Sequence, residues 1–175
     1  LPIYEADCLK HRDEPDSVKK DRYQYISELT AKINQYNEVL TRWIQMRQGT
    51  LNLRITSFAL QPLFDIVQKG KMNFDMKGVE LVVEPTEAVV KADRTLTLFM
   101  INTMADNARK FTPQGGRVMV SASMADAYVE ICITDTGVGM DDKQLEHVFD
   151  RTYTGGHGFG LLNCKGIIEK YKKVS

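Results

Sequence analysis

The chain has 175 residues, enough for one domain with its own core or for one domain plus a long helix. Its 23 Lys+Arg balance its 23 Asp+Glu, which argues against charge-driven nucleic-acid binding, and 43% hydrophobic residues exclude a disordered chain. The three cysteines, Cys8, Cys132 and Cys164, lack disulfide or metal-ligand spacing, so we expect a reducing, cytoplasmic setting.

The N-terminal part predicts an irregular leader followed by a long helix. Residues 1–17 have no regular pattern, with a polar stretch from His11 that ends in a turn signal, and the absence of an initiator Met suggests a fragment of a larger protein. Apolar residues then recur at alternating spacings of three and four, as in a coiled-coil stripe. They are Ile26, Leu29, Ile33, Tyr36, Leu40 and Trp43. We expect a helix over 17–48 with Gly49 as its cap, in a bundle or dimer rather than facing an ordinary core.

The middle of the chain mixes short strands and helices. Alternation of apolar and polar residues predicts a strand over 51–55. A shared apolar face predicts a helix over 58–71 with Pro62 in its first turn. A strand over 79–83 and a shorter one near 89–90 follow. An apolar helix is expected to begin soon after them.

The C-terminal half gives a clearer pattern. The apolar helix, over 95–111, stops before the turn signal Pro113-Gln-Gly-Gly. Two alternating strands then meet in a hairpin at 125–127. The remaining elements are a short helix over 141–149, a glycine-rich loop over 152–160 and a helix over 161–172. This order predicts an α+β fold, a two-layer sandwich with helices on one side of a mixed sheet.

Asn107 is a polar residue on the otherwise apolar helix over 95–111. An amide oxygen suits Mg²⁺ that phosphate oxygens also hold, and Lys110 lies about one turn further, within reach of the same phosphates. The plainer interpretation is a surface Asn and a solvated Lys on an amphipathic helix. This segment taken alone favours the plainer interpretation.

Asp135 ends the second hairpin strand and enters a glycine-rich turn. A carboxylate in that place can accept a hydrogen bond from an exocyclic amine such as that of adenine. Gly137 and Gly139 allow a flat ring to approach the backbone. A plain Asp-Thr-Gly turn is the ordinary alternative. An aspartic-protease motif is disfavoured because that chemistry needs a second carboxylate.

Gly156, Gly158 and Gly160 form a glycine-rich loop that enters the last helix. Backbone N–H groups and the positive end of the helix dipole would face a phosphate there. The spacing and surroundings fit neither a P-loop nor a dinucleotide-binding fingerprint. A flexible linker is the ordinary alternative.

Together these segments resemble the ATP-binding catalytic domain of sensor histidine kinases, in the class that includes DNA gyrase B subunits, MutL and a chaperone ATPase. The resembling motifs are an N box, Asn107-Ala-Arg-Lys-Phe-Thr; a first glycine box, Asp135-Thr-Gly-Val-Gly-Met; an F box, Leu145-Glu-His-Val-Phe-Asp; and a second glycine box, Gly156-His-Gly-Phe-Gly-Leu. Upstream, 43–53 resembles the junction between a second dimerisation helix and the catalytic domain. The amino-acid sequences of these motifs are similar to those of hybrid two-component sensors of Bacteroides-type bacteria.

The resemblance implies a division into domains and a set of ligands. Residues 1–17 would be a leader, 18–49 the second dimerisation helix and 50–175 the catalytic ATP-binding domain. ATP and Mg²⁺ are the implied cofactors, with Asn107 as the Mg²⁺ ligand. The implied ATP-binding residues are Asn107, Lys110, Phe111, Asp135, Gly137, Gly139, Met140, Phe149, Gly156, Gly158, Phe159, Gly160 and Leu161. The stretch 149–160 would be the lid over the nucleotide.

The resemblance also implies the reaction and the partners. The γ-phosphoryl group of ATP would pass to a His on the dimerisation hairpin and then to an Asp of a response-regulator receiver domain. The parent protein would be a homodimer anchored in the bacterial inner membrane, with this part in the cytoplasm and no nucleic-acid partner. The alternatives are an ATPase of the gyrase or MutL type and a degenerate nucleotide-binding dimerisation module.

Two features depart from the family pattern. Thr103 stands one turn before Asn107, where the family commonly carries Asn, Glu or another polar residue. The phosphoacceptor His is the second departure, because His11 lacks the expected pattern and is interpreted as a tail residue. His147 and His157 are interpreted as helix-surface and lid residues. The substrate His is therefore expected outside this chain.

Overall fold

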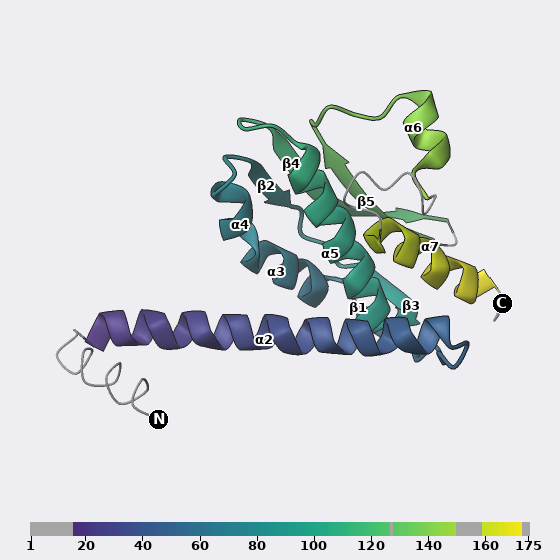
Figure 1. Cartoon of the computed structure of the whole chain (residues 1–175), viewed down its shortest axis with the longest axis horizontal. Coiled ribbons are helices and arrows are strands. Elements are labelled where there is room, and N and C mark those ends of the chain that lie inside the picture. Colours follow the sequence, from purple (N-terminus) through teal and green to yellow (C-terminus); the bar gives the residue numbers. More distant parts are fainter. Residues whose placement is uncertain (1–15, 127, 150–158, 173–175) are drawn as a thin grey trace. The chain divides into compact units, whose positions relative to one another are not determined.

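The computed structural model describes residues 16–126, 128–149 and 159–172 of the chain (Figure 1). The chain divides into two compact units, Leu1–Ile44 and Gln45–Ser175. In the part that the structure describes, no helix is both long and apolar enough to cross a membrane.

The helix α2 spans Asp16–Arg47 and confirms the helix predicted over 17–48. Just beyond it, Gly49 has a φ of +71°, a left-handed conformation that glycine adopts without steric cost. The backbone N–H of Leu51 turns back to donate to the Gln45 carbonyl at 3.1 Å, so one of the last carbonyls of the helix is satisfied. Gly49 therefore acts as the predicted cap.

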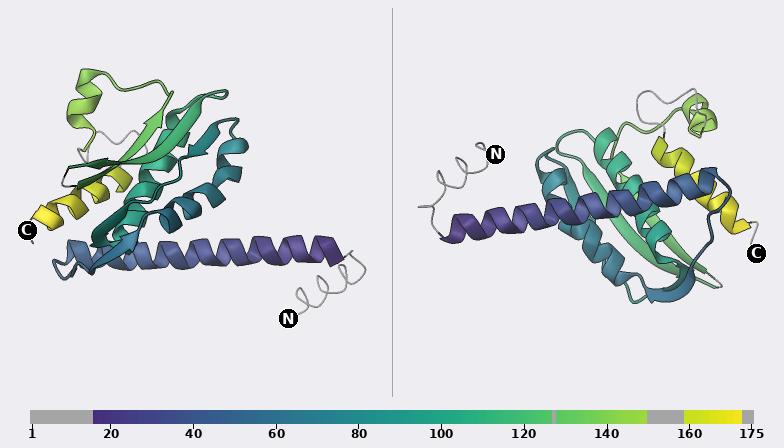
Figure 2. Two further views of the ribbon diagram at one scale, coloured as in Figure 1. Left: turned by 180° about the vertical axis from the view of Figure 1, so that it is seen from behind. Right: turned by 60° about the horizontal axis from the view of Figure 1, so that its bottom comes forward.

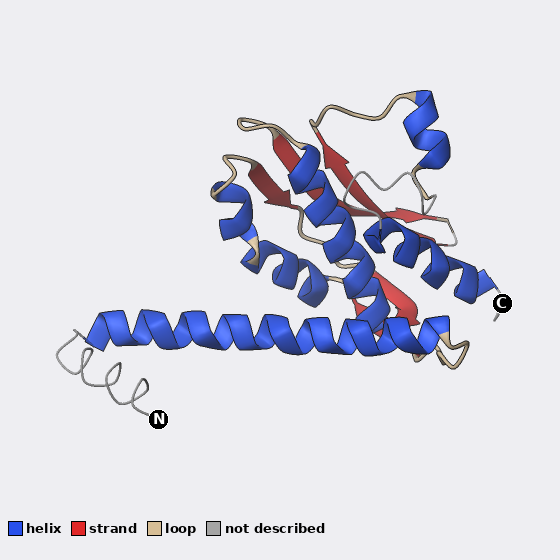
Figure 3. Ribbon diagram, in the orientation of Figure 1, coloured by secondary structure: helices blue, strands red, loops and turns tan. Residues whose placement is uncertain are grey.

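The strands of the second unit form two sheets (Figure 3). One sheet pairs β1 (Ile55–Ala59) antiparallel with β3 (Val89–Asp93). The other has the order β2-β4-β5 and consists of β2 (Glu80–Val83), β4 (Arg117–Ala125) and β5 (Tyr128–Asp135). Its β2 and β4 are parallel, and β4 and β5 are antiparallel. The sheet is therefore mixed, as predicted, and Ala125 opposite Tyr128 confirms the hairpin.

Helices cover one face of the mixed sheet. They are α3 (Gln61–Lys69), α4 (Lys71–Asp75) and α5 (Arg94–Phe111), while α7 (Phe159–Lys172) packs on α5 and α6 (Asp142–His147) follows β5 along the chain. Of these, α3 and α4 contact β2, while α5 contacts β4 and β5. The result is the α+β sandwich that the sequence predicts.

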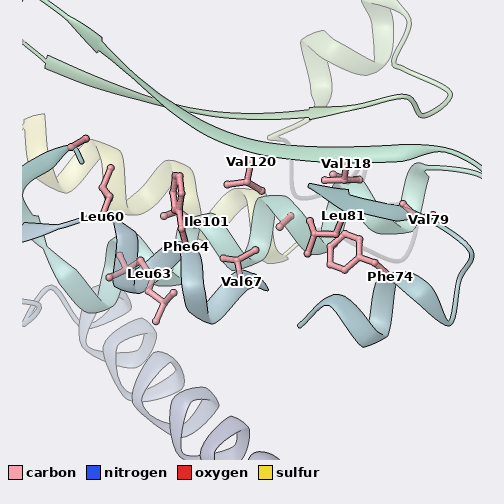
Figure 4. Close-up of a cluster of buried hydrophobic side chains, with 14 residues drawn as sticks. Leu60, Leu63, Phe64, Val67, Phe74, Val79, Leu81, Ile101, Val118 and Val120 are labelled. Carbon is pink, nitrogen blue, oxygen red and sulfur yellow. The ribbon is translucent and has the colours of Figure 1, made fainter. Parts of the chain in front are cut away.

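The main core lies between the sheet and the helices (Figure 4). Val118 and Val120, both fully buried, point from β4 toward the helices and belong to one cluster with Phe64 of α3. Along β5, residues at alternate positions pack against this core, namely Val129, Ile131 and Ile133. Their alternation is the one that predicts the strand, since successive side chains of a strand point to opposite faces.

A smaller core joins the chain after α2 to α5 and α7. Leu51, Leu96 and Ile167 are buried together, and Leu53 and Tyr171 pack around them. Figure 2 shows α7 alongside α5 from two further directions. This cluster explains why residues after Gly49 are apolar without belonging to a strand.

Asp93 fixes the start of α5 from a buried position. Its Oδ1 accepts a hydrogen bond from the Leu96 N–H at 3.2 Å, the arrangement of a helix N-cap. Its Oδ2 accepts from the Arg54 N–H at 2.8 Å, and its own N–H donates to the Tyr171 hydroxyl at 2.8 Å. One residue thus ties the linker, α5 and α7 together.

Three predicted bounds are wrong. The strand placed over 51–55 begins only at Ile55, because Leu51 and Leu53 face the smaller core instead of a sheet. The helix placed over 58–71 starts later, because Phe58 belongs to β1, and it ends at Lys69, where Gly70 separates α3 from α4. Pro62 does lie in the first turn, as predicted. The glycine-rich loop placed over 152–160 ends earlier, because Gly160 is already in α7.

Candidate functional site

Asn107 lies about one turn before the C-terminal end of α5 and is half-buried. Within the described residues its amide makes no hydrogen bond, so both its donor and its acceptor are available. The charges nearby are partly paired, because Asp106 accepts from the Arg109 guanidinium at 2.6 Å and lies 3.7 Å from the Lys110 ammonium. Lys110 remains exposed. The segment therefore presents an amide and an ammonium group about one turn apart.

The C-terminal end of α5 is closed by groups from elsewhere in the second unit. Thr112 donates to the Ala108 carbonyl through its N–H at 3.0 Å and its Oγ1 at 2.7 Å. The Lys77 ammonium donates to the Arg109 carbonyl at 2.7 Å and to the Lys110 carbonyl. The cation therefore lies at the negative end of the helix dipole. Each of these carbonyls would otherwise lack an intrahelical partner.

The turn after β5 packs against this same end of α5. A Cβ atom added at Gly137 would lie 2.7 Å from the Phe111 carbonyl oxygen, so the close approach requires glycine. The Gly137 N–H donates to Asp135 Oδ1 at 2.8 Å, and the Val138 N–H points to the Phe111 carbonyl at 3.4 Å. Gly139 has a φ of +68°. The turn thus holds the exposed Asp135 carboxylate beside the end of α5.

The first turn of α7 packs against the middle of α5. A Cβ atom added at Gly160 would lie 2.7 Å from Cγ2 of Thr103, well inside van der Waals contact. One turn along α7, the Cys164 thiol is buried and hydrogen-bonded to the Thr103 side chain. Burial raises the pKa of this thiol to about 11, while the Thr103 hydrogen bond acts in the opposite direction.

The two glycine contacts therefore bracket Asn107 on one helix. Gly160 meets Thr103 one turn before Asn107, and Gly137 meets Phe111 one turn after it. Residues four apart lie on the same side of a helix. The turn that contains Gly137 and the start of α7 at Gly160 therefore meet α5 on either side of Asn107 along the helix.

The segment between β5 and the F box carries exposed apolar side chains. Met140 is exposed, and Asp141 is the N-cap of α6, in a capping box in which the side chains of Asp141 and Gln144 accept hydrogen bonds from each other's backbone N–H groups. Phe149 is exposed at 41%, and the Lys165 ammonium of α7 lies 5.5 Å from the centroid of its ring. The F-box aromatic thus lies near α7.

Not every predicted site residue can be placed. Asn107, Lys110, Phe111, Asp135, Gly137, Gly139, Met140, Phe149, Gly160 and Leu161 lie in the described second unit. Gly156, Gly158, His11 and His157 lie outside the described residues, and Phe159 is placed only as the first residue of α7. Sequence reasoning missed Lys77, whose sole signal is a lysine before a glycine. It also treated Thr103 only as a departure, although Thr103 contacts α7.

The side chains fit a magnesium ion held mainly by a nucleotide. Among the described residues there is no group of three or more His, Cys, Asp or Glu that could hold a metal. Magnesium usually keeps several waters and takes few protein ligands beside phosphate oxygens. The half-buried Asn107 amide, with no partner in the described part of the chain, suits such a shared ligand sphere.

Comparison with known proteins gives a family match over the region that holds these residues. Residues 92–175 match the family described as "Histidine kinase-, DNA gyrase B-, and HSP90-like ATPase". The signal transduction histidine-protein kinase BaeS of Escherichia coli K12 is 25% identical over 170 residues, which cover 89% of this chain and 36% of BaeS. The chain thus spans about a third of the length of this relative.

Solved structures agree with the family match. The mycobacterial sensor histidine kinase MprB superposes with a TM-score of 0.58 at 27% identity, over 66% of this chain and 79% of that one. Full-length ShkA, solved in complex with AMPPNP, gives a TM-score of 0.62 at 23% identity, over 84% of this chain and 33% of ShkA, a likeness of fold alone. The second unit therefore carries an ATP-binding catalytic domain of the sensor histidine kinase type, and residues 92–175 of that unit match the family of histidine kinase-, DNA gyrase B- and HSP90-like ATPases.

Proposed function

We propose that this chain is the ATP-binding part of a sensor histidine kinase, and that Mg-ATP binds along the Asn107 face of α5. The observation that supports the proposal is that two other segments meet α5 on either side of Asn107. The Asp135 turn packs at Phe111 and the start of α7 packs at Thr103, one turn to either side of Asn107. Three segments that are far apart in the sequence thus border one place.

The phosphate end of the nucleotide is assigned to α5 and α7. Asn107 would offer its amide oxygen to Mg²⁺, and Lys110 would place its ammonium near the phosphates. Phe111 would pack beside the nucleotide. The loop into α7 would present backbone N–H groups to the phosphates, with the helix dipole adding to the attraction. The residues assigned to the lid are Phe149, Gly156, Gly158, Phe159, Gly160 and Leu161.

The base end is assigned to the turn after β5. Asp135 Oδ1 is occupied by the Gly137 N–H, so Oδ2 is the acceptor for the adenine amine. Gly137 and Gly139 leave the flat ring access to the backbone, and the exposed Met140 would cover it. Binding would bury apolar surface that is exposed in the free chain.

The reaction proposed is transfer of the γ-phosphoryl group to an imidazole nitrogen of a His. The bond from the γ-phosphorus to the β–γ bridging oxygen breaks, that oxygen leaves with ADP, and a P–N bond forms. Bound Mg²⁺ supplies neutralisation of phosphate charge. The chain's own residues hold the nucleotide in line and exclude water, so most of their contribution is positioning.

The partners follow from this assignment. Residues 18–49 would form the second helix of the dimerisation hairpin and 50–175 the catalytic domain, a division supported by the compact unit that begins at Gln45. The acceptor His would lie on the first hairpin helix, outside this chain, and a receiver-domain Asp would take the phosphoryl group next. The full protein would be a homodimer with this part in the cytoplasm. The likeness to hybrid sensors remains a prediction.

Calorimetry with Mg-ADP tests nucleotide binding directly. Wild type should bind, and Asp135→Ala should lose about tenfold or more in affinity, since a buried base amine would be left without its acceptor. Glu130→Ala is the matched control, because it removes an exposed carboxylate from the same strand. Absence of binding by wild type contradicts the nucleotide site. Equal losses in the two variants contradict the adenine role of Asp135.

A second assay separates the kinase from an ATPase. A hydrolase of this class needs an acidic group to activate water about one turn before Asn107, and Thr103 occupies that position. We expect negligible ATP turnover by the chain alone. Radiolabelled ATP should instead label an added dimerisation hairpin that carries its His. Turnover without labelling would favour the ATPase, and binding without either would favour a non-catalytic module.

A further inference from the structure

The helices α5 and α7 pack along a continuous seam. On α7, Gly160, Cys164, Ile167 and Tyr171 follow spacings of four, three and four, so they share one face. Their partners on α5 run in the opposite order. Gly160 and Cys164 meet Thr103, whereas Ile167 and Tyr171 meet residues at the start of α5. The helices are therefore antiparallel neighbours, with the start of α7 nearest Asn107.

The far end of the seam is held firmly. Ile167 is buried with Leu96 and Leu51, and the Tyr171 hydroxyl accepts the Asp93 N–H at 2.8 Å. At the near end, both contacts that can be assigned involve Thr103. There the contacts are the Thr103 methyl on Gly160 and the Thr103 hydroxyl with the Cys164 thiol. Thr103 thus makes two different contacts with α7 through the two branches of one side chain.

We propose that Thr103 is a positioning residue, which holds the first turn of α7 against α5 beside Asn107 at the proposed nucleotide site. The inference rests on the proposed nucleotide site. In this chain the position one turn before Asn107 acts by packing, in place of the polar role that the family resemblance suggests. It also assigns a reason for glycine at 160 that does not involve the phosphates.

The geometry makes this contact specific. Because threonine is branched at Cβ, its methyl group cannot move away without turning the hydroxyl away from Cys164 as well. An added methyl at position 160 would meet Cγ2 of Thr103 at 2.7 Å. Serine at position 103 keeps the hydroxyl and removes that methyl. Gly160→Ala should therefore displace α7, and Thr103→Ser should make room for it.

The first arm of the test needs no nucleotide. Peptide-resolved mass spectrometry follows alkylation of Cys164 by iodoacetamide, with the exposed Cys132 as an internal standard. Gly160→Ala should speed the Cys164 reaction about tenfold, as expected for an overpacked contact, and Gly160→Ala/Thr103→Ser should return it near the wild-type rate. Helix propensity predicts the opposite for Gly160→Ala, because alanine favours the helix. No acceleration would overturn the packing role.

The second arm measures the affinity for Mg-ADP in the same variants. Gly160→Ala should weaken binding about tenfold, and Thr103→Ser should restore most of it in the double variant. Gly160→Ala/Thr97→Ser is the control, since Thr97 also loses a methyl on α5 but does not meet Gly160. Its affinity should stay low.

The outcomes separate the inference from the function it rests on. If the wild-type protein does not bind Mg-ADP, both the proposed function and the positioning role of Thr103 are overturned. The alkylation rate of Cys164 would still show whether Gly160 packs on Thr103. Wild type that binds, with no rescue by Thr103→Ser, overturns the positioning role alone. If Thr97→Ser also restored the Mg-ADP affinity of Gly160→Ala, the positioning role would be overturned too, since the recovery would not depend on Cγ2 of Thr103.

Discussion

Asp135 holds its own turn and offers one oxygen to a ligand. Oδ1 accepts the Gly137 N–H at 2.8 Å, and Gly137 packs on the Phe111 carbonyl. An asparagine in its place could still accept the Gly137 N–H, but it would present an NH₂ donor where the carboxylate presents an acceptor. Adenine carries an amine at that ring position, and guanine carries a carbonyl oxygen.

We therefore expect Asp135→Asn to change the base preference. Affinity for Mg-ADP should fall about tenfold or more, and the ratio of GDP to ADP affinity should rise, because a donor now faces a donor in adenine and an acceptor in guanine. Calorimetry with both nucleotides measures the ratio. Glu130→Gln, the same change at an exposed position of β5, should leave it unaltered. An unchanged ratio in Asp135→Asn would place the base elsewhere.

Cys164 gives a prediction about pH. Burial raises the pKa of its thiol from the ordinary value of 9.0 to about 11. The folded state therefore keeps the proton where the unfolded state loses it. Stability from this group is fully present below pH 9 and is lost as the pH rises through 11. A two-unit difference corresponds to about 2–3 kcal/mol.

Urea unfolding at several pH values tests this sign. The free energy of unfolding of wild type should fall more steeply between pH 9 and 11 than that of Cys164→Ala, whose core has no thiol to titrate. The comparison of slopes removes the constant cost of the smaller side chain. Parallel curves for the two proteins would show that the thiol titrates normally in the folded state.

At the scale of the elements, the end of α5 depends on a residue from another segment. Lys77 donates to the Arg109 and Lys110 carbonyls, so it satisfies two terminal acceptors and places a positive charge at the C-terminal end of the helix dipole. Asn107 and Lys110 lie in the turns that this contact secures. The proposed nucleotide site therefore depends on the stability of α5.

Removing that charge should weaken the second unit. Lys77→Met keeps most of the aliphatic stem, and we expect it to lower the free energy of unfolding by about 1–2 kcal/mol through the lost charge-assisted hydrogen bonds. Lys91→Met, at an exposed position of β3, should stay within about 0.5 kcal/mol of wild type. Chemical denaturation measures both. Equal stabilities for the two variants would mean that water replaces Lys77 at no cost.

Elements with a strong local pattern were predictable, and those set by distant contacts were not. The alternation of β4 and β5 and the capped α2 follow from their own residues. Leu51 and Leu53 alternate like a strand, yet they pack against Leu96 and Ile167, far along the chain. The order of the glycine motifs predicted a common site. The contact between Gly160 and Thr103 could not be predicted in the same way, because it depends on α7 lying antiparallel to α5.

At the scale of the whole molecule, the two units differ in how far they bury their apolar residues. The second unit has its own core, whereas the helix α2 has apolar residues that face water. Tyr23, Ile26 and Ile33 are exposed at 73%, 56% and 58% and follow spacings of three and seven, so they lie along one side of α2. Exposed apolar stripes of this kind favour association.

The chain should therefore self-associate through α2 without involving the nucleotide site. Sedimentation velocity should show a mass that increases with concentration, and Ile26→Lys/Ile33→Lys should weaken association about tenfold or more, because each isoleucine buried at an interface contributes roughly 1.5–3 kcal/mol. Ser27→Lys/Asn34→Lys is the matched control, with the same added charge one residue along at exposed positions. Affinity for Mg-ADP should be the same in all three proteins, since the second unit is compact by itself. A wild type that sediments as a monomer at every concentration, or equal losses in the two double variants, would mean that the stripe does not drive association.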